Sequence, residues 1–299
     1  MKVLSILVVV NYVQLAFNLI HIVGKEGPCV TKDVQDIINK ANPSDVVQLG
    51  CSENTIFIPE TIELTRTIAI DGAGKNIISK VENGKPLFNA NIFPRPSKFG
   101  TIVIKNMSIF MTTESSTSVL VKNQRTHLTI LNVKFNTIGI KYTAVITEKC
   151  GDVFVSNSIF SDSDVAIDSK ECGVFSFIKN HVVSSTKKSG RIVVRSKNES
   201  VKVIFMRNRI ETGFSKKTFV LFAKGRLKVI KNIMKNMLTE ECIMHFEDLS
   251  IDSTPENKID RVTCIFHFIP KEKSVMIEWF LKFLGTNSHS GDQLANVTL

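Results

Sequence analysis

Three pairs of cysteines in this chain share one separation. The interval is 22 residues in the pairs Cys29 and Cys51, Cys150 and Cys172, and Cys242 and Cys264. Six cysteines, an even number, suggest disulfides in a chain bound for an oxidising compartment. The alternative is a zinc site, but the sequence contains no Cys-x-x-Cys pair of the kind that binds zinc. Equivalent residues on neighbouring strands of a stacked parallel β structure lie about 4.8 Å apart, which a disulfide accepts. We therefore predict one disulfide in each pair.

A short apolar strand that ends in asparagine recurs through the middle of the chain. The asparagines are Asn106, Asn132, Asn157, Asn180, Asn208 and Asn232, in steps of 26, 25, 23, 28 and 24 residues. A second strand is expected about a dozen residues later in most repeats, at 118–121, 143–146, 165–167, 191–194, 218–222 and 242–246. Short strands separated by Ser, Thr, Asn, Asp and Gly in every repeat favour a coil over a series of hairpins.

These repeats resemble the right-handed parallel β-helix, or pectin lyase-like, superfamily, whose members commonly stack asparagines in a ladder. The six asparagines match such a ladder, residues 34–41 match a capping helix, and residues 68–75 match a Gly-rich corner. The resemblance implies an all-β, right-handed parallel β-helix solenoid of about nine coils with short capping helices at both ends. The second capping helix is expected at 274–284, where apolar residues are too few to span a membrane.

The two ends of the chain predict its domain organisation. One lysine followed by an apolar run has the layout of a secretory signal, so we predict a signal peptide at 1–24 and an extracellular protein. A retained anchor over 3–23 is the alternative, although Asn11, Gln14, Asn18 and His21 interrupt it. The β-helix domain is expected at 25–284 and a flexible tail at 285–299, with no membrane span once the signal is removed.

The positive charge is concentrated in one part of the chain. The whole sequence has a net charge of +10, and between Lys179 and Lys235 there are 16 Lys or Arg against two acids, or +14. Each residue before a ladder asparagine should face outward, which places Lys179, Arg207 and Lys231 in a column about 4.8 Å apart. The predicted ligand-binding residues are Lys179, Arg207, Lys231, Arg209, Lys216 and Lys217. Such a column suits a linear polyanion; the alternative is a solvated, Lys-rich face that blocks aggregation.

The resemblance also raises an enzymatic alternative, because related enzymes are typically polysaccharide lyases or hydrolases that use carboxylates, often with calcium. The candidate catalytic residues are Asp162, Asp164, Asp168, Arg191 and Arg195. Asp162 and Asp164 share a strand face and could hold calcium. Asp is also an ordinary turn residue, and the Asn-Thr-Asp, Asp-Asp, Gly-His-Gly and Arg-Ile-Lys motifs of related polygalacturonases are missing. The preferred interpretation is therefore non-catalytic, with no cofactor; calcium enters only if the protein is a lyase.

Together these features predict a secreted, adhesin-like or effector-like protein that binds acidic polysaccharide or a cell-surface glycan through a basic face. The alternatives are a divergent pectate lyase-like enzyme and a structural coat or wall component. Secretion disfavours nucleic acid as the polyanion. His245 and His267 should stack one coil apart, but without a third ligand we predict no metal site. N-glycans are expected at Asn198 and Asn296, whereas the ladder should hide the sequon at Asn106.

Overall fold

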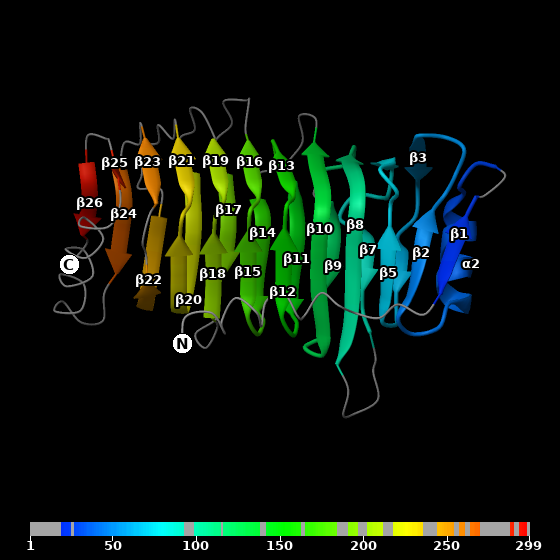
Figure 1. The fold of residues 1–299 in the computed structure, drawn as a ribbon, viewed down its shortest axis with the longest axis horizontal. Helices are drawn as coiled ribbons and strands as arrows, with labels where there is room; N and C mark the ends of the chain where they lie inside the picture. The colour runs from blue at the N-terminus through cyan, green and yellow to red at the C-terminus, as the bar shows by residue number, and fades with distance from the viewer. Residues whose placement is uncertain are drawn as a thin grey trace.

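In the computed structural model the chain winds into an elongated stack of parallel strands (Figure 1). The structure describes residues 19–24, 27–92, 99–114, 116–137, 142–162, 165–183, 191–196, 202–211, 218–235, 244–253, 257–260, 264–269, 288–289 and 293–297. All of the strand pairings in this part of the chain are parallel, and each joins a strand to its equivalent one coil away. The result is an all-β parallel solenoid, which confirms the predicted fold class.

The strands stack in three columns, one on each side of the coil. The first column contains β1 (Ile20–Val23), β2 (Asp45–Leu49), β5 (Ile68–Asp71), β8 (Gly100–Met111), β10 (Thr126–Thr137), β12 (Val153–Ser156), β15 (Phe175–Ile178), β18 (Lys202–Met206), β20 (Thr218–Ile230) and β22 (Met244–Ser253). The second contains β3 (Thr55–Ile58), β6 (Asn76–Ser79), the ends of β8 and β10, β13 (Ile159–Ser161), β16 (His181–Val183), β19 (Arg209–Glu211), β21 (Ile233–Lys235), β23 (Lys258–Asp260) and β25 (Ser288–His289). The third contains β4 (Ile62–Leu64), β7 (Pro86–Ala90), β9 (Thr117–Val121), β11 (Thr143–Lys149), β14 (Val165–Glu171), β17 (Arg191–Ser196), the first halves of β20 and β22, β24 (Cys264–Ile269) and β26 (Gln293–Val297).

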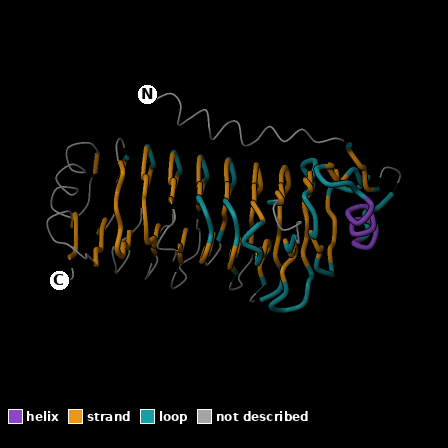
Figure 2. The backbone as a smooth tube through the Cα atoms, turned by 90° about the horizontal axis from the view of Figure 1, so that it is seen from below, coloured by secondary structure: helices purple, strands orange, loops and turns teal. Residues whose placement is uncertain are grey.

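The third column contains ten strands within the described residues, so the number of coils differs slightly from the expected nine. Helix α2 (Thr31–Lys40) closes one end of the stack, as predicted, and buries Thr31, Val34 and Ile38 against it (Figure 2). The expected second capping helix at 274–284 lies outside the described residues. Strands β25 and β26 lie within 285–299, the segment for which the sequence predicts a flexible tail.

The interior is a continuous apolar core that runs the length of the coil. Alternate residues of each strand point inward, as the pleat requires. Phenylalanines stack from coil to coil: ring centroids are 4.8 Å apart between Phe135 and Phe160, and 5.4 Å apart between Phe177 and Phe205. Each of these rings is fully buried. The core therefore fixes which side chains are left to face outward.

A polar ladder of one serine and four asparagines lines the inside of one corner, between the first and second columns. Its members are Ser158, Asn180, Asn208, Asn232 and Asn257, each at most 1 % exposed. The Oδ1 atoms of Asn180, Asn208, Asn232 and Asn257 each accept the backbone N–H of the preceding member at 2.9 Å. Each amide also donates to a backbone carbonyl of the previous coil, as Asn208 does to Phe177 O at 2.8 Å. The predicted ladder thus exists, and it satisfies buried backbone groups at the corner.

Three of the six predicted ladder members are wrong. Asn106, Asn132 and Asn157 lie one position earlier in their coils, with left-handed φ angles of 52–58°. Asn132 and Asn157 are exposed and Asn106 is half-buried. The step from Asn157 to Asn180 is 23 residues, whereas the register between these coils is 22. Asparagine therefore occurs at two different positions of the coil, in an exposed turn in some coils and in the buried ladder in others.

Two of the three predicted disulfides are present. Cys29 bonds to Cys51 and Cys150 bonds to Cys172, with Cα separations of 5.4 and 4.6 Å. Cys150 and Cys172 are equivalent residues of successive coils, because Lys149 is in register with Glu171. Cys29 instead precedes helix α2 and ties it to the end of β2. Of the third pair, Cys242 lies outside the described residues.

Strand β1 belongs to the fold although it lies within 1–24, the segment predicted to be a signal peptide. Residues Ile20–Val23 pair in register with Val46–Leu49, and the Val23 side chain is fully buried. Asp45, also fully buried, accepts hydrogen bonds from the Leu19 N–H at 3.2 Å, from the Asn42 N–H at 2.8 Å and from His21 Nε2 at 2.8 Å. The hydrogen bond from His21 is the main cause of a lowered pKa at Asp45. The first coil therefore starts before the expected mature terminus at Lys25.

Candidate functional site

One corner of the coil presents a column of side chains on its outer surface, all exposed except the half-buried Asn106. The strands of the first column are in register at Leu131, Ser156, Ile178, Met206 and Ile230. The residue after each of these turns the corner. We call the six residues Asn106, Asn132, Asn157, Lys179, Arg207 and Lys231 the corner column, and all six have φ angles of 52–58°. Successive members lie one coil apart, about 4.8 Å along the stack.

The three cations predicted to form a column do so, in the second half of the corner column. Lys179, Arg207 and Lys231 are exposed, and the next residue of each strand is a buried ladder asparagine. The residues at the equivalent position in the first half of the column are Asn157, Asn132 and Asn106. The prediction instead places the residue before each of these asparagines on the outside. The outward column therefore has two chemically distinct halves, one of amides and one of cations.

Lys179 and Arg207 form no ion pair within the described part of the chain, unlike several other lysines of the surface. Lys122 lies 3.5 Å from Glu148, Lys149 lies 3.8 Å from Glu171, and Lys85 lies 2.6 Å from Glu82. These pairs are exposed and contribute little to stability, but they neutralise charge locally. The charges of Lys179 and Arg207 are left for solvent or for a ligand.

Arg209, two residues beyond Arg207, is exposed but already paired. Its Nε and Nη2 atoms lie 3.0 and 2.8 Å from Glu211 Oε1. The Arg209 guanidinium holds the pKa of the Glu211 carboxyl below its ordinary value. His181 Nε2 lies 3.7 Å from the other oxygen of this carboxylate. Arg209 thus contributes less free charge to the basic face than the sequence predicts. The other two predicted contacts, Lys216 and Lys217, lie outside the described residues.

The candidate catalytic residues are only partly brought together. Asp168 is in register with Arg195 of the next coil, and Asp168 is 6 % exposed. Asp162 is half-buried at the end of β13, at a corner with a φ of 56°. Arg191 lies at the start of β17, and Asp164 is outside the described residues. Among the described residues no group of three or more His, Cys, Asp or Glu side chains could hold a metal ion.

The remaining predicted sites are placed as follows. His245 and His267 are in register on β22 and β24. Asn296 lies in β26, and Asn198 is outside the described residues. The prediction that the ladder would hide Asn106 is wrong, because Asn106 is outside the ladder. Tyr142 is 2 % exposed and hydrogen-bonded to the Ser118 hydroxyl, so it is no surface platform for a sugar.

The fold and this surface define the protein as a parallel β-solenoid with an exposed corner column, cationic in one half. Comparison of the chain with protein-family models, curated proteins and solved structures finds no match. No helix in the described part of the chain has the length and apolar character needed to cross a membrane.

Proposed function

We propose that this protein is a secreted, non-catalytic β-solenoid that binds a linear acidic polysaccharide or cell-surface glycan through Lys179, Arg207 and Lys231. In this proposal it is a divergent relative of the pectin lyase-like superfamily. The regular pitch of the three cations supports a ligand with repeating negative charges rather than a compact anion. Single exposed contacts are weak and screened by salt, so affinity comes from their number.

The observation that carries the proposal is the backbone conformation of these three residues. A left-handed φ costs an ordinary L-residue about 1–2 kcal/mol, and only Gly, Asn and Asp adopt it routinely. Three coils meet this requirement with Asn, whereas the next three use Lys179, Arg207 and Lys231. Stacked like charges also repel one another, by up to about 1 kcal/mol for an adjacent pair in water. The cations are therefore present against local conformational and electrostatic preference, which is typical of ligand sites.

The lyase alternative rests on a different observation, the register of Asp168 with Arg195. A carboxylate and a guanidinium on adjacent coils are groups that a polysaccharide lyase could use, with calcium as the added cation. The corner column and this pair lie on different strands, so an experiment can separate the two functions.

The test is a glycan array of polyuronates, sulfated glycans and neutral glycans, run at two salt concentrations with and without calcium. We expect binding to the acidic chains alone, weaker at high salt, independent of calcium and lost in Lys179→Glu/Arg207→Glu/Lys231→Glu. Calcium-dependent release of unsaturated uronate, seen as rising absorbance, would instead support the lyase. Failure on every glycan would contradict binding and favour a structural coat component.

A further inference from the structure

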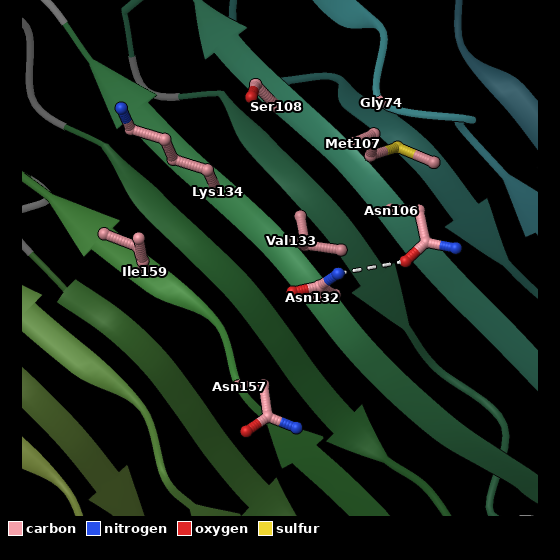
Figure 3. A pocket seen from close by; sticks show the side chains of 9 residues that line it. All are labelled: Gly74, Asn106, Met107, Ser108, Asn132, Val133, Lys134, Asn157 and Ile159. Carbon is pink, nitrogen blue, oxygen red and sulfur yellow. Dashed lines mark hydrogen bonds between the residues drawn. The ribbon is translucent and has the colours of Figure 1, made fainter.

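A shallow groove runs beside the amide half of the corner column (Figure 3). It is lined by Gly74, Asn106, Met107, Ser108, Asn132, Val133, Lys134, Asn157 and Ile159. Its volume is about 220 Å³, below the roughly 300–1,000 Å³ of typical small-molecule pockets. The lining residues come from four successive coils, with Gly74 on the first and Asn157 and Ile159 on the last. It therefore fits a stretch of an extended chain better than an enclosed small ligand.

One side of the groove carries amides, the other carries a hydroxyl, an ammonium and an aliphatic side chain, and the floor between them is apolar. Figure 3 shows the asparagines of the corner column along one side and Ser108, Lys134 and Ile159 along the other. Met107 and Val133 lie between the two sides and are 3 % and 1 % exposed. Polar groups on both sides of an apolar floor suit a sugar ring, which has hydroxyl groups at its edge and C–H groups on its faces.

Several polar groups of the groove have hydrogen-bonding capacity left. An asparagine amide has two N–H donors and an acceptor oxygen. Asn132 donates one N–H to Asn106 Oδ1 at 3.1 Å, and Asn106 donates to Asp71 Oδ1 at 3.2 Å. Asn157 forms no side-chain hydrogen bond, and Lys134 forms no ion pair, within the described residues. A ligand in the groove would thus meet amide donors and acceptors and one cation.

We propose that this groove is a second subsite for the same acidic polysaccharide, which lies parallel to the long axis of the solenoid and continues from the cations onto the asparagines. The inference rests on the proposed function and on the unbroken register of the corner column. The three cations span two coil intervals, about 10 Å, and all six residues span five, about 24 Å. A short chain therefore reaches only Lys179, Arg207 and Lys231, whereas a longer chain also fills the groove.

The test is a titration of the full chain with oligogalacturonates graded in length from about 10 Å to beyond 24 Å. Affinity should rise about tenfold once the chain is long enough to add a few hydrogen bonds in the groove. Asn132→Gly with Asn157→Gly, which removes two amides and keeps the left-handed backbone accessible, should abolish this rise and leave short-chain affinity unchanged. Lys134→Gln should reduce it. The control substitutions Asn83→Gly and Lys170→Gln make the same kinds of change at residues that lie away from the groove.

The outcomes separate the two proposals. If short chains bind but affinity does not rise with length, or rises equally in the asparagine variant, the groove proposal is wrong and the cationic site stands. If no oligogalacturonate binds and sulfated oligosaccharides of the same lengths also fail, both proposals are wrong. Side-chain amide NMR signals of Asn132 and Asn157 supply a second readout. They should shift with long chains only; a shift that follows protein concentration without sugar would instead show that a second copy occupies the groove.

Discussion

Asn157 and Lys179 occupy the same corner of successive coils, with φ angles of 52° and 58°. The backbone imposes one requirement on both residues, yet the exposed side chain changes there from an amide to a cation. The cations continue at Arg207 and Lys231. Conformation alone accounts for the asparagines and not for this change, which is why the corner column suggests a ligand.

Replacing the three cations with the residue that the neighbouring coils use should separate function from stability. In Lys179→Asn/Arg207→Asn/Lys231→Asn we expect the free energy of unfolding to rise, by up to about 1 kcal/mol for each site, because Asn adopts the left-handed conformation at lower cost. Retention on an immobilised polyuronate should be lost. The measurements are urea unfolding and salt elution.

The control for that variant removes the same number of charges elsewhere. Lys122, Lys149 and Lys170 are exposed at the C-terminal ends of the third-column strands β9, β11 and β14, away from the corner column. Their replacement with Asn should leave retention nearly unchanged and give no gain in stability. Equal loss of retention in both triple variants would show that net charge alone governs binding.

The buried ladder should be sensitive to a single substitution. Asn208→Ala leaves the Asn180 N–H without its acceptor and removes the donors to Phe177 O and to Asn232 Oδ1. An unsatisfied buried N–H and a small cavity together predict a loss of about 2–4 kcal/mol in unfolding free energy. Asn132→Gly, at the exposed corner, should change it by no more than about 0.5 kcal/mol. Similar losses in both variants would contradict the division into two positions.

If the protein is secreted as proposed, its mature N-terminus should lie at or before Leu19 rather than at Lys25, because β1 belongs to the first coil. Mass spectrometry of the secreted chain checks this. A chain that begins at Leu19 should be more stable than one that begins at Lys25 by about 3 kcal/mol, since the shorter chain loses the burial of Val23 and two hydrogen bonds to Asp45. Equal thermal stability of the two chains would mean that β1 contributes nothing.

Asp45 should make the first coil sensitive to acid. Its folded-state pKa lies below the ordinary value of 3.8, chiefly because His21 donates a hydrogen bond to it. A lowered folded pKa contributes stability that is present above pH 3.8 and lost as the pH falls through the folded value. Asp45→Asn should remove that part of the pH dependence. The comparison is between unfolding curves of the two proteins from pH 6 to pH 2; parallel profiles would contradict this role.

We predict the third disulfide, between Cys242 and Cys264, from the register of the described strands beside it. Met244 is in register with Phe266, an offset of 22 residues, which is the separation of Cys242 and Cys264. Peptide mapping without reductant should recover these two cysteines in one linked pair. Recovery of Cys242 linked to Cys172 would overturn this register.

The class of fold and most strands could be predicted from the sequence, because stacking repeats the same demands at each coil. The expected segments at 118–121, 143–146 and 165–167 correspond to β9, β11 and β14. The corner register could not be read from asparagine alone, since the amide suits both a left-handed turn and a buried ladder. The next inward apolar residue distinguishes them: it comes three residues after Asn157, at Phe160, and two after Asn180, at Val182.

The cationic half of the corner column could be predicted in part, because successive coils repeat the same strand and corner. Lys179, Arg207 and Lys231 precede true ladder asparagines, so the inference that they face outward was sound. The groove could not be predicted because one of its two walls comes from residues two positions beyond the corner, Ser108, Lys134 and Ile159, which share no residue type. The ladder member Asn257 could not be found by the same pattern, because the residues directly before it are not the apolar end of a strand. The residues after it supply a signal, since Lys258-Ile259 repeats the pattern of Arg209-Ile210, which follows Asn208.

The ladder has a consequence for how such a chain can change in length. Each asparagine from Asn180 to Asn232 offers its carbonyl oxygen to the coil before it and its backbone N–H to the coil after it. If one whole coil were deleted or duplicated, each ladder asparagine would still face another asparagine, so the same hydrogen bonds could form. The protein is thus built from exchangeable units, and the number of charges along its edge can be altered by copying a winding without redesigning the interior.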